Sequence, residues 1–88
     1  MLILFAMTAV GGYTNHSDTQ LPPNIEKQFI KQTKQYKHVE ITSLSTQVVA
    51  GINYKLHVNL DGKQATIVFW AKLDKTVEFK GIQWIKND

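Results

Sequence analysis

The chain has 88 residues, a formal net charge of +3 and no cysteine, and 43% of its residues are hydrophobic against 19% charged. This length suits one domain made of one sheet and one covering helix, and the missing cysteine excludes disulfides, thiolate metal sites and a cysteine nucleophile. No apolar stretch approaches the roughly 18 residues that cross a bilayer, so we expect a soluble domain without a membrane partner.

The positive charge comes from ten lysines and no arginine. Five of these lysines fall within residues 27–55, where they are spread along polar faces. Nucleic-acid binders usually concentrate arginine and lysine into a stripe, and arginine supplies the bidentate phosphate and guanine contacts. We therefore expect a solvated basic surface and no nucleic-acid partner, which leaves room for weak attraction to an acidic partner.

Residues 1–10, MLILFAMTAV, form an apolar leader without charge. One interpretation is an N-terminal trunk or strand, which favours a cytoplasmic protein. The other is the core of a signal segment cut near Ala9, which would make the protein secreted and Asn15 a glycosylation candidate. The first is favoured because the basic residues that usually precede a signal core are missing.

A polar connector over 13–20 leads to a predicted helix over 23–37. Pro22 and Pro23 mark its start, because proline is tolerated in the first helical turn, where its missing N–H costs nothing. The apolar face has nearly helical spacing and predicts packing of one side on a sheet. Its members are Ile25, Phe29, Ile30, Thr33 and Tyr36.

From Val39 onward the hydrophobic pattern changes to a period of two, which predicts strands. A strand is expected before the run at 47–51, and the clearest alternation follows that run. Its core-facing positions are Ile52, Tyr54, Leu56, Val58 and Leu60.

Asp61-Gly62 predicts a tight hairpin, because a type I′ turn requires positive φ at both central residues. The return strand alternates as well, with core-facing Ala65, Ile67, Phe69 and Ala71. A last strand begins near Val77 and shifts phase near Gly81, which indicates a β-bulge there. The pattern as a whole predicts an α+β fold with an antiparallel sheet of four to five strands wrapped on one α-helix.

The run Gln47-Val48-Val49-Ala50-Gly51 places two valines at a turn between strands, where polar residues are usual. With the strand that follows it, QVVAGINYKLHV resembles the first binding hairpin of the cystatins, and most closely their cysteine-free stefin branch. The resemblance extends to Val10-Gly11-Gly12 as an N-terminal trunk and to 72–75 as a second hairpin. It covers most of the chain and implies that residues 1–88 form a single cystatin-like domain.

The resemblance implies a reversible, non-covalent inhibitor of papain-like cysteine proteases, whose trunk and two hairpins enter the active-site cleft as a wedge. Ten residues are then expected to contact the protease. They are Val10, Gly11, Gly12, Gln47, Val48, Val49, Ala50, Gly51, Leu73 and Asp74. Full covering of Val48 or Val49 by the partner would contribute about 1.5–3 kcal/mol each.

The family often holds the second valine in a strained backbone conformation. This implies that Val49 is strained here too, and that a monomer has a liability to domain-swapped dimers.

Two departures from the family pattern carry expectations of their own. Leu73-Asp74 stands where many secreted cystatins present Pro-Trp, and loss of a tryptophan anchor costs about 2 kcal/mol, or a factor of about 30 in affinity. The segment from Gly11 to Gln47 is also short for the family by roughly two helical turns, about 11 Å if helical. The alternative hypothesis is therefore a non-inhibitory cystatin-fold scaffold for protein interactions, in which this shortening breaks the line of trunk and hairpins.

Catalysis and cofactors find little support in the sequence. His16, His38 and His57 lack metal-ligand spacing and lie near no carboxylate pattern that would make one a general base. We expect no cofactor and no enzyme. Trp70 and Trp84 are expected to be partly buried sheet residues, although an exposed pair would offer a stacking platform.

Overall fold

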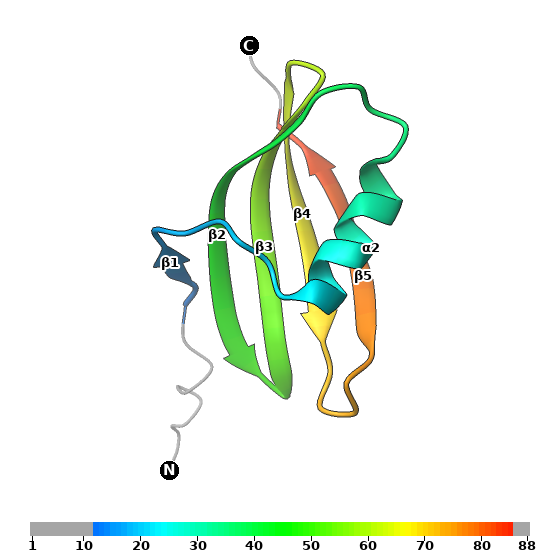
Figure 1. Ribbon diagram of the computed structural model, residues 1–88. Helices are drawn as coiled ribbons and strands as arrows, with labels where there is room; N and C mark the ends of the chain where they lie inside the picture. The colour runs from blue at the N-terminus through cyan, green and yellow to red at the C-terminus, as the bar shows by residue number, and fades with distance from the viewer. Residues whose placement is uncertain (1–11, 86–88) are drawn as a thin grey trace.

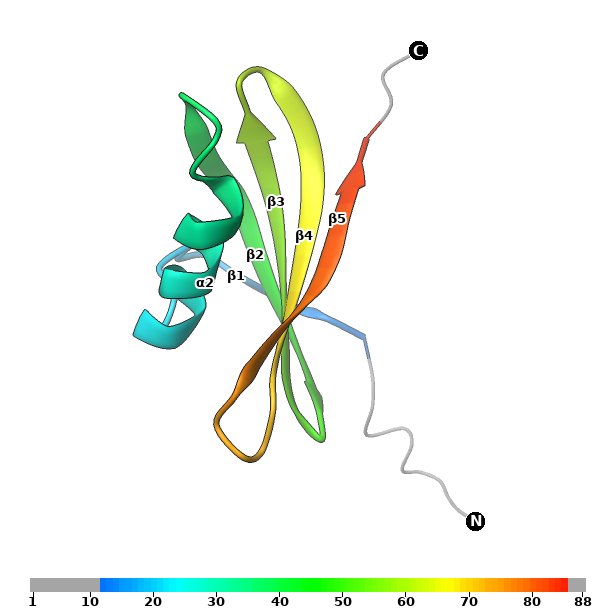
Figure 2. The ribbon, with the colours of Figure 1, turned by 90° about the vertical axis from the view of Figure 1, so that its right-hand side faces the viewer.

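The computed structural model describes residues 12–85. In chain order, its elements are β1 (Thr14–His16), α2 (Pro23–Thr33), β2 (Val39–Val49), β3 (Gly51–Leu60), β4 (Lys63–Ala71) and β5 (Val77–Trp84). The strands form one antiparallel sheet in the order β1-β2-β3-β4-β5, and α2 covers one face of it (Figure 1). Figure 2 shows that, among these described residues, no helix lies on the other face. The predicted α+β fold, with a five-stranded antiparallel sheet and one helix, is confirmed.

The core lies between α2 and the inner face of the sheet, where the predicted alternation places apolar side chains. Phe69 of β4 is fully buried and packs against Phe79 of β5 with ring centroids 5.7 Å apart. The buried apolar residues are Ile25, Phe29, Leu44, Leu56, Val58, Leu60, Ala65, Ile67 and Phe69. The period of two thus identified the core face of β3 and β4 correctly.

The helix departs from the prediction in length and in its buried face. It ends at Thr33 instead of Lys37, because the chain tightens there: the Tyr36 N–H donates to the Thr33 carbonyl oxygen at 3.0 Å. Tyr36 then packs partly buried against the core. Ile30 was predicted to face the sheet and is instead 59% exposed, because the helix buries only the stripe of every fourth residue, Ile25, Phe29 and Thr33.

The N-terminal part of the sheet was also predicted incorrectly. The segment 13–20 was expected to be a polar connector, yet Thr14–His16 forms the edge strand β1. Its three side chains are exposed, so no alternation reveals the strand. The strand or trunk predicted within residues 1–10 lies outside the described residues.

Two local predictions about turns are confirmed. Asp61 and Gly62 both have positive φ, 53° and 89°, as the type I′ hairpin requires. The pairing of β4 with β5 shifts register between Val68 and Phe69, which leaves Lys80 as the extra residue beside Gly81. The predicted bulge is therefore present, and Gly81 has a φ of 133°.

Candidate functional site: the two-hairpin end of the sheet

The first hairpin joins β2 to β3 with Ala50 alone at its tip, since Val49 pairs with Gly51 and Val48 pairs with Ile52. Gly51 has a φ of 107°, a conformation that L side chains rarely adopt. A Cβ atom at Gly51 would also lie 2.1 Å from the Ala71 carbonyl oxygen at the end of β4. Glycine is therefore required here both by backbone conformation and by the close approach of the neighbouring strand.

Val48 is 70% exposed, although it lies on the face of the sheet that α2 covers elsewhere. The helix does not reach this end of the sheet, and the paired residue Ile52 is 36% exposed for the same reason. Val49 is half-buried. Val49 has no positive φ, so the strain expected at the second valine is not found as a left-handed conformation; the positive angle falls on Gly51.

Gln47 lies at the base of this hairpin, where its side chain accepts a hydrogen bond across the strands. The Asn53 Nδ2 atom donates to Gln47 Oε1 at 3.1 Å. Gln47 and Asn53 are also directly paired in the β2–β3 register, so this bond closes the hairpin just below the valines. The role of Gln47 visible in the structure is to hold the hairpin together.

The second hairpin joins β4 to β5 and exposes Leu73 by 79%. Its backbone is closed by Lys72 N–H donating to the Thr76 carbonyl oxygen at 2.8 Å and by Lys75 N–H donating to the Lys72 carbonyl oxygen at 3.0 Å. Asp74 Oδ1 accepts from the Thr76 hydroxyl at 2.6 Å and from the Thr76 N–H at 3.0 Å. These bonds lower the pKa of Asp74 below its ordinary value. Asp74 thus shapes the loop from which Leu73 projects.

The two hairpins lie at the same end of the sheet (Figure 1). A side chain for which the sequence indicated no role at this site contacts both of them. Trp70 of β4 donates its indole Nε1–H to the Ala50 carbonyl oxygen at 2.9 Å. Nothing in the period-two pattern distinguishes this tryptophan from any other outward-facing strand residue. Trp70 and Trp84 do not form a stacking platform, because Trp70 pairs with Glu78 near the hairpins while Trp84 pairs with Ala65 near the other end.

The start of the described chain also lies by the first hairpin. β1 runs antiparallel to β2 with Thr14 opposite Thr46, so the chain enters β1 from the side of the hairpin. The Tyr13 ring lies 4.1 Å from Lys55 Nζ, which anchors this segment to β3 by a cation–π contact. Gly12 is exposed, whereas Val10 and Gly11 lie outside the described residues.

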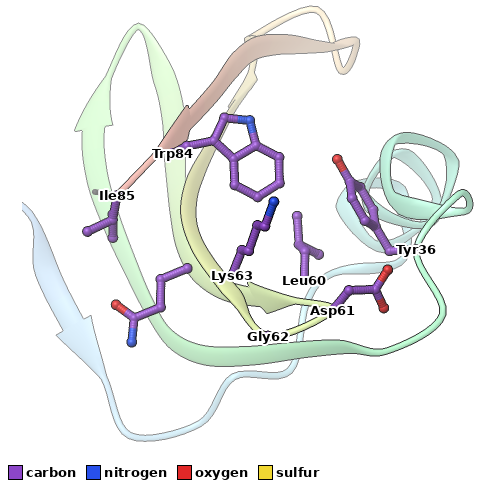
Figure 3. Close-up of a pocket in the computed structure, with 8 residues that line it drawn as sticks. Tyr36, Leu60, Asp61, Gly62, Lys63, Trp84 and Ile85 are labelled. Atoms are coloured by element: carbon purple, nitrogen blue, oxygen red, sulfur yellow. The ribbon is translucent and has the colours of Figure 1, made fainter. Parts of the chain in front are cut away.

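The opposite end of the sheet carries a hollow of about 680 Å³ that contains none of the predicted site residues. Figure 3 shows Lys63, Leu60 and Trp84 between Tyr36 on one side and Ile85 on the other. Tyr36 and Trp84 meet edge to face with ring centroids 6.1 Å apart. Asp61 Oδ1 accepts the His38 N–H at 2.7 Å, so that carboxylate holds the chain between α2 and β2.

The described part of the chain offers no constellation for metal chemistry. Within residues 12–85, no three histidine, aspartate or glutamate side chains come together to hold a metal ion. His16 Nε2 and His57 Nδ1 instead share hydrogen bonds with the hydroxyls of Thr46 and Thr66, at 2.6 and 3.2 Å. In the same residues, no helix combines the length and apolarity that crossing a membrane requires.

Comparison with known proteins agrees with this geometry. A family model for the cystatin domain matches residues 26–84, which include the helix from its fourth residue, both hairpins and all strands except β1. The chain therefore belongs to the cystatin family, whose members are generally inhibitors of proteases and not enzymes. No curated protein matches the chain.

Proposed function

We propose that this protein is a reversible, non-covalent inhibitor of papain-like cysteine proteases of the stefin-like type. The observation that carries the proposal is the exposure of two apolar side chains, Val48 and Leu73, on two hairpins at one end of the sheet. Large apolar side chains that project from loops gain free energy when a partner covers them, by about 1.5–3 kcal/mol each. The partner that fits such a projecting edge is a cleft.

The proposed contact residues divide by what their side chains do in the free protein. Val48 and Leu73 project and are available to a protease, while Val49 is half-buried. Gln47, Gly51 and Asp74 hold the hairpins in shape, and the Ala50 carbonyl is occupied by Trp70. Val10, Gly11 and Gly12 would form the trunk. The position of β1 beside β2 supports this proposal despite the short segment before Gln47.

No chemical step is required of this chain. The trunk would occupy substrate-binding pockets without offering a bond to the catalytic cysteine, because Gly11 lets the backbone turn away from it. Inhibition would then be competitive with substrate and fully reversible. A monomer is sufficient for this mode of binding, and a domain-swapped dimer would remove the first hairpin from the edge.

A substitution in the first hairpin tests the proposal. Val48→Asp places a charge where the wedge would be desolvated, so we expect the inhibition constant for papain to rise about 30-fold or more, which is about 2 kcal/mol. Ile30→Asp is the matched control, because Ile30 is an apolar residue 59% exposed on α2, away from the hairpins. Both variants should unfold at nearly the wild-type temperature.

The competing hypothesis, a non-inhibitory cystatin-fold scaffold, makes the opposite prediction for the same titration. Folded wild-type protein would leave papain activity unchanged, and Val48→Asp would not differ from it. Equal losses for Val48→Asp and Ile30→Asp would also contradict the wedge, since they would show that the effect does not depend on the hairpin.

A further inference from the structure

The outer face of the sheet carries one row of side chains across four strands near the hairpin end. The register pairs Gln47 of β2 with Asn53 of β3, Asn53 with Trp70 of β4, and Trp70 with Glu78 of β5. Facing residues on neighbouring strands contact one another directly. Trp70 is the only aromatic residue of this row, and its indole reaches past β3 to the tip of the first hairpin.

The bond from Trp70 to the first hairpin ends on the backbone of its tip. The acceptor is the carbonyl of Ala50, the single residue between β2 and β3, at 2.9 Å from Nε1. Beside this bond, Gly51 is pressed against the Ala71 carbonyl, so that no Cβ fits between the strands. The tip of the first hairpin is therefore held from β4, in addition to its own strand pairing.

The same ring is also tied to the second hairpin. Lys72 Nζ lies 5.1 Å and Lys80 Nζ 5.6 Å from the centroid of the Trp70 ring. Both ammonium groups bind Glu78, at 3.1 and 3.3 Å, which lowers the pKa of that carboxyl. Lys72 is the residue whose backbone N–H and carbonyl close the second loop below Leu73. Its side chain therefore joins the base of this loop to Trp70 and β5.

We propose that Trp70 is a positioning residue that fixes the separation of Val48 and Leu73, the two projecting side chains of the hairpins. The inference rests on the proposed function, because that separation matters only if both tips enter one cleft. Hairpins that move independently would lose conformational freedom on binding, whereas hairpins already tied together lose less. Trp70 itself is half-buried and need not touch the protease.

Replacement of Trp70 by phenylalanine separates the hydrogen bond from the packing. Trp70→Phe keeps an aromatic ring under Lys72 and Lys80 and removes the indole donor to Ala50 together with part of the ring area. Trp84→Phe is the matched control, since it makes the same change at the other end of the sheet. We expect dissociation from papain to become about fivefold faster for Trp70→Phe, the fold-change that corresponds to about 1 kcal/mol, and to stay unchanged for Trp84→Phe.

Amide hydrogen exchange measures the effect of the Trp70–Ala50 hydrogen bond on the first hairpin without any protease. We expect the amides of Ala50 and Gly51 to exchange about fivefold faster in Trp70→Phe, and those of Val58 and Ile67 in the core to exchange at the wild-type rate. A merely structural loss would raise exchange in the core as well and lower the unfolding temperature in proportion. Lys72→Met provides a second variant that keeps Trp70, and we expect faster exchange in it at Lys75, whose N–H closes the second loop.

The two readouts distinguish failure of this inference from failure of the proposed function. If wild-type protein does not inhibit papain, the proposed function is wrong, and exchange at Ala50 and Gly51 still decides whether Trp70 holds the hairpin. Unchanged exchange at the tip in Trp70→Phe would overturn the inference. Papain dissociation that is accelerated as much by Trp84→Phe as by Trp70→Phe would overturn it too.

Discussion

The two ends of the sheet expose apolar side chains in opposite ways. At one end, Val48 projects from the end of β2, and Leu73 projects from a loop that backbone hydrogen bonds and Asp74 close. At the other end, Tyr36 and Trp84 line a hollow beside the polar Asp61-Gly62 turn. A projecting apolar edge can enter a partner's cleft, whereas a hollow can only receive a projecting group of a partner. This difference, and not the amount of exposed apolar surface, is the reason why we propose the hairpin end as the binding site.

Glycine substitutions at the two ends should show the largest difference between them, measured as loss of unfolding free energy. Gly51→Ala combines a positive φ with a Cβ that would lie 2.1 Å from the Ala71 carbonyl oxygen, so we expect a loss of about 3 kcal/mol or more in unfolding free energy. Gly62→Ala has a positive φ but open space, and we expect about 1–2 kcal/mol. Urea denaturation measures both. Equal losses would show that strand contact at Gly51 does not matter.

Truncation of one exposed residue at each end should separate binding from stability. We expect Leu73→Ala to weaken papain inhibition about tenfold, since burial of its side chain by a protease contributes about 1.5 kcal/mol. Its unfolding temperature should not change, because Leu73 is 79% exposed.

Trp84→Ala should do the reverse: it loses the edge-to-face contact with Tyr36, worth about 0.5–1.5 kcal/mol, and leaves inhibition unchanged. Thermal unfolding and inhibition kinetics on both variants test whether Leu73→Ala lowers only inhibition and Trp84→Ala lowers only stability. Weaker inhibition by Trp84→Ala at unchanged stability would mean that the opposite end also contacts the protease.

A smaller effect is expected where the N-terminal segment meets the hairpin end. Lys55→Met removes the ammonium group over the Tyr13 ring, a cation–π contact worth about 0.5–1 kcal/mol at an exposed site. Amide exchange in β1 should become about two- to fivefold faster. Lys63→Met at the opposite end is the control and should leave β1 unchanged. Without any change in Lys55→Met, the anchoring of this segment would depend on strand pairing alone.

Acid should loosen the second hairpin, with the smallest effect on the whole molecule. The pKa values of Asp74 and Glu78 are lowered, by hydrogen bonds from Thr76 and from Lys72 and Lys80 respectively. A carboxyl whose pKa is lower in the folded state stabilises the fold above its unfolded pKa of about 4 and loses that contribution as pH falls through the folded value. We therefore expect the Thr76 amide, which donates to Asp74, to lose protection relative to its intrinsic exchange rate below about pH 4. NMR titration of both carboxyls should give pKa values below the ordinary ones. Ordinary values for both would contradict these contacts.

The sequence predicted best those elements whose side chains alternate between core and solvent. The faces of β3 and β4 and the Asp61-Gly62 turn were predicted correctly, because burial and positive φ each leave a mark on residue type. β1 was missed because its three side chains are exposed, and the helix end was misplaced because Tyr36 is apolar but packs from a loop.

The candidate site was predictable only in part. The exposed Val48 and Leu73 follow from the hairpin motif, whereas the bond of Trp70 to Ala50 depends on a contact between strands twenty residues apart in the chain. No local pattern encodes such a contact. The family resemblance located the hairpins, and only the three-dimensional arrangement shows what ties them together.

The most direct test of the central claim is a titration of papain with this protein, using chains that begin at residue 1 and at residue 10 and following hydrolysis of a small fluorogenic substrate. We predict competitive and reversible inhibition, with a difference between the two chains that measures what the leader contributes. Full papain activity in the presence of either folded protein would contradict the wedge and favour the non-inhibitory scaffold.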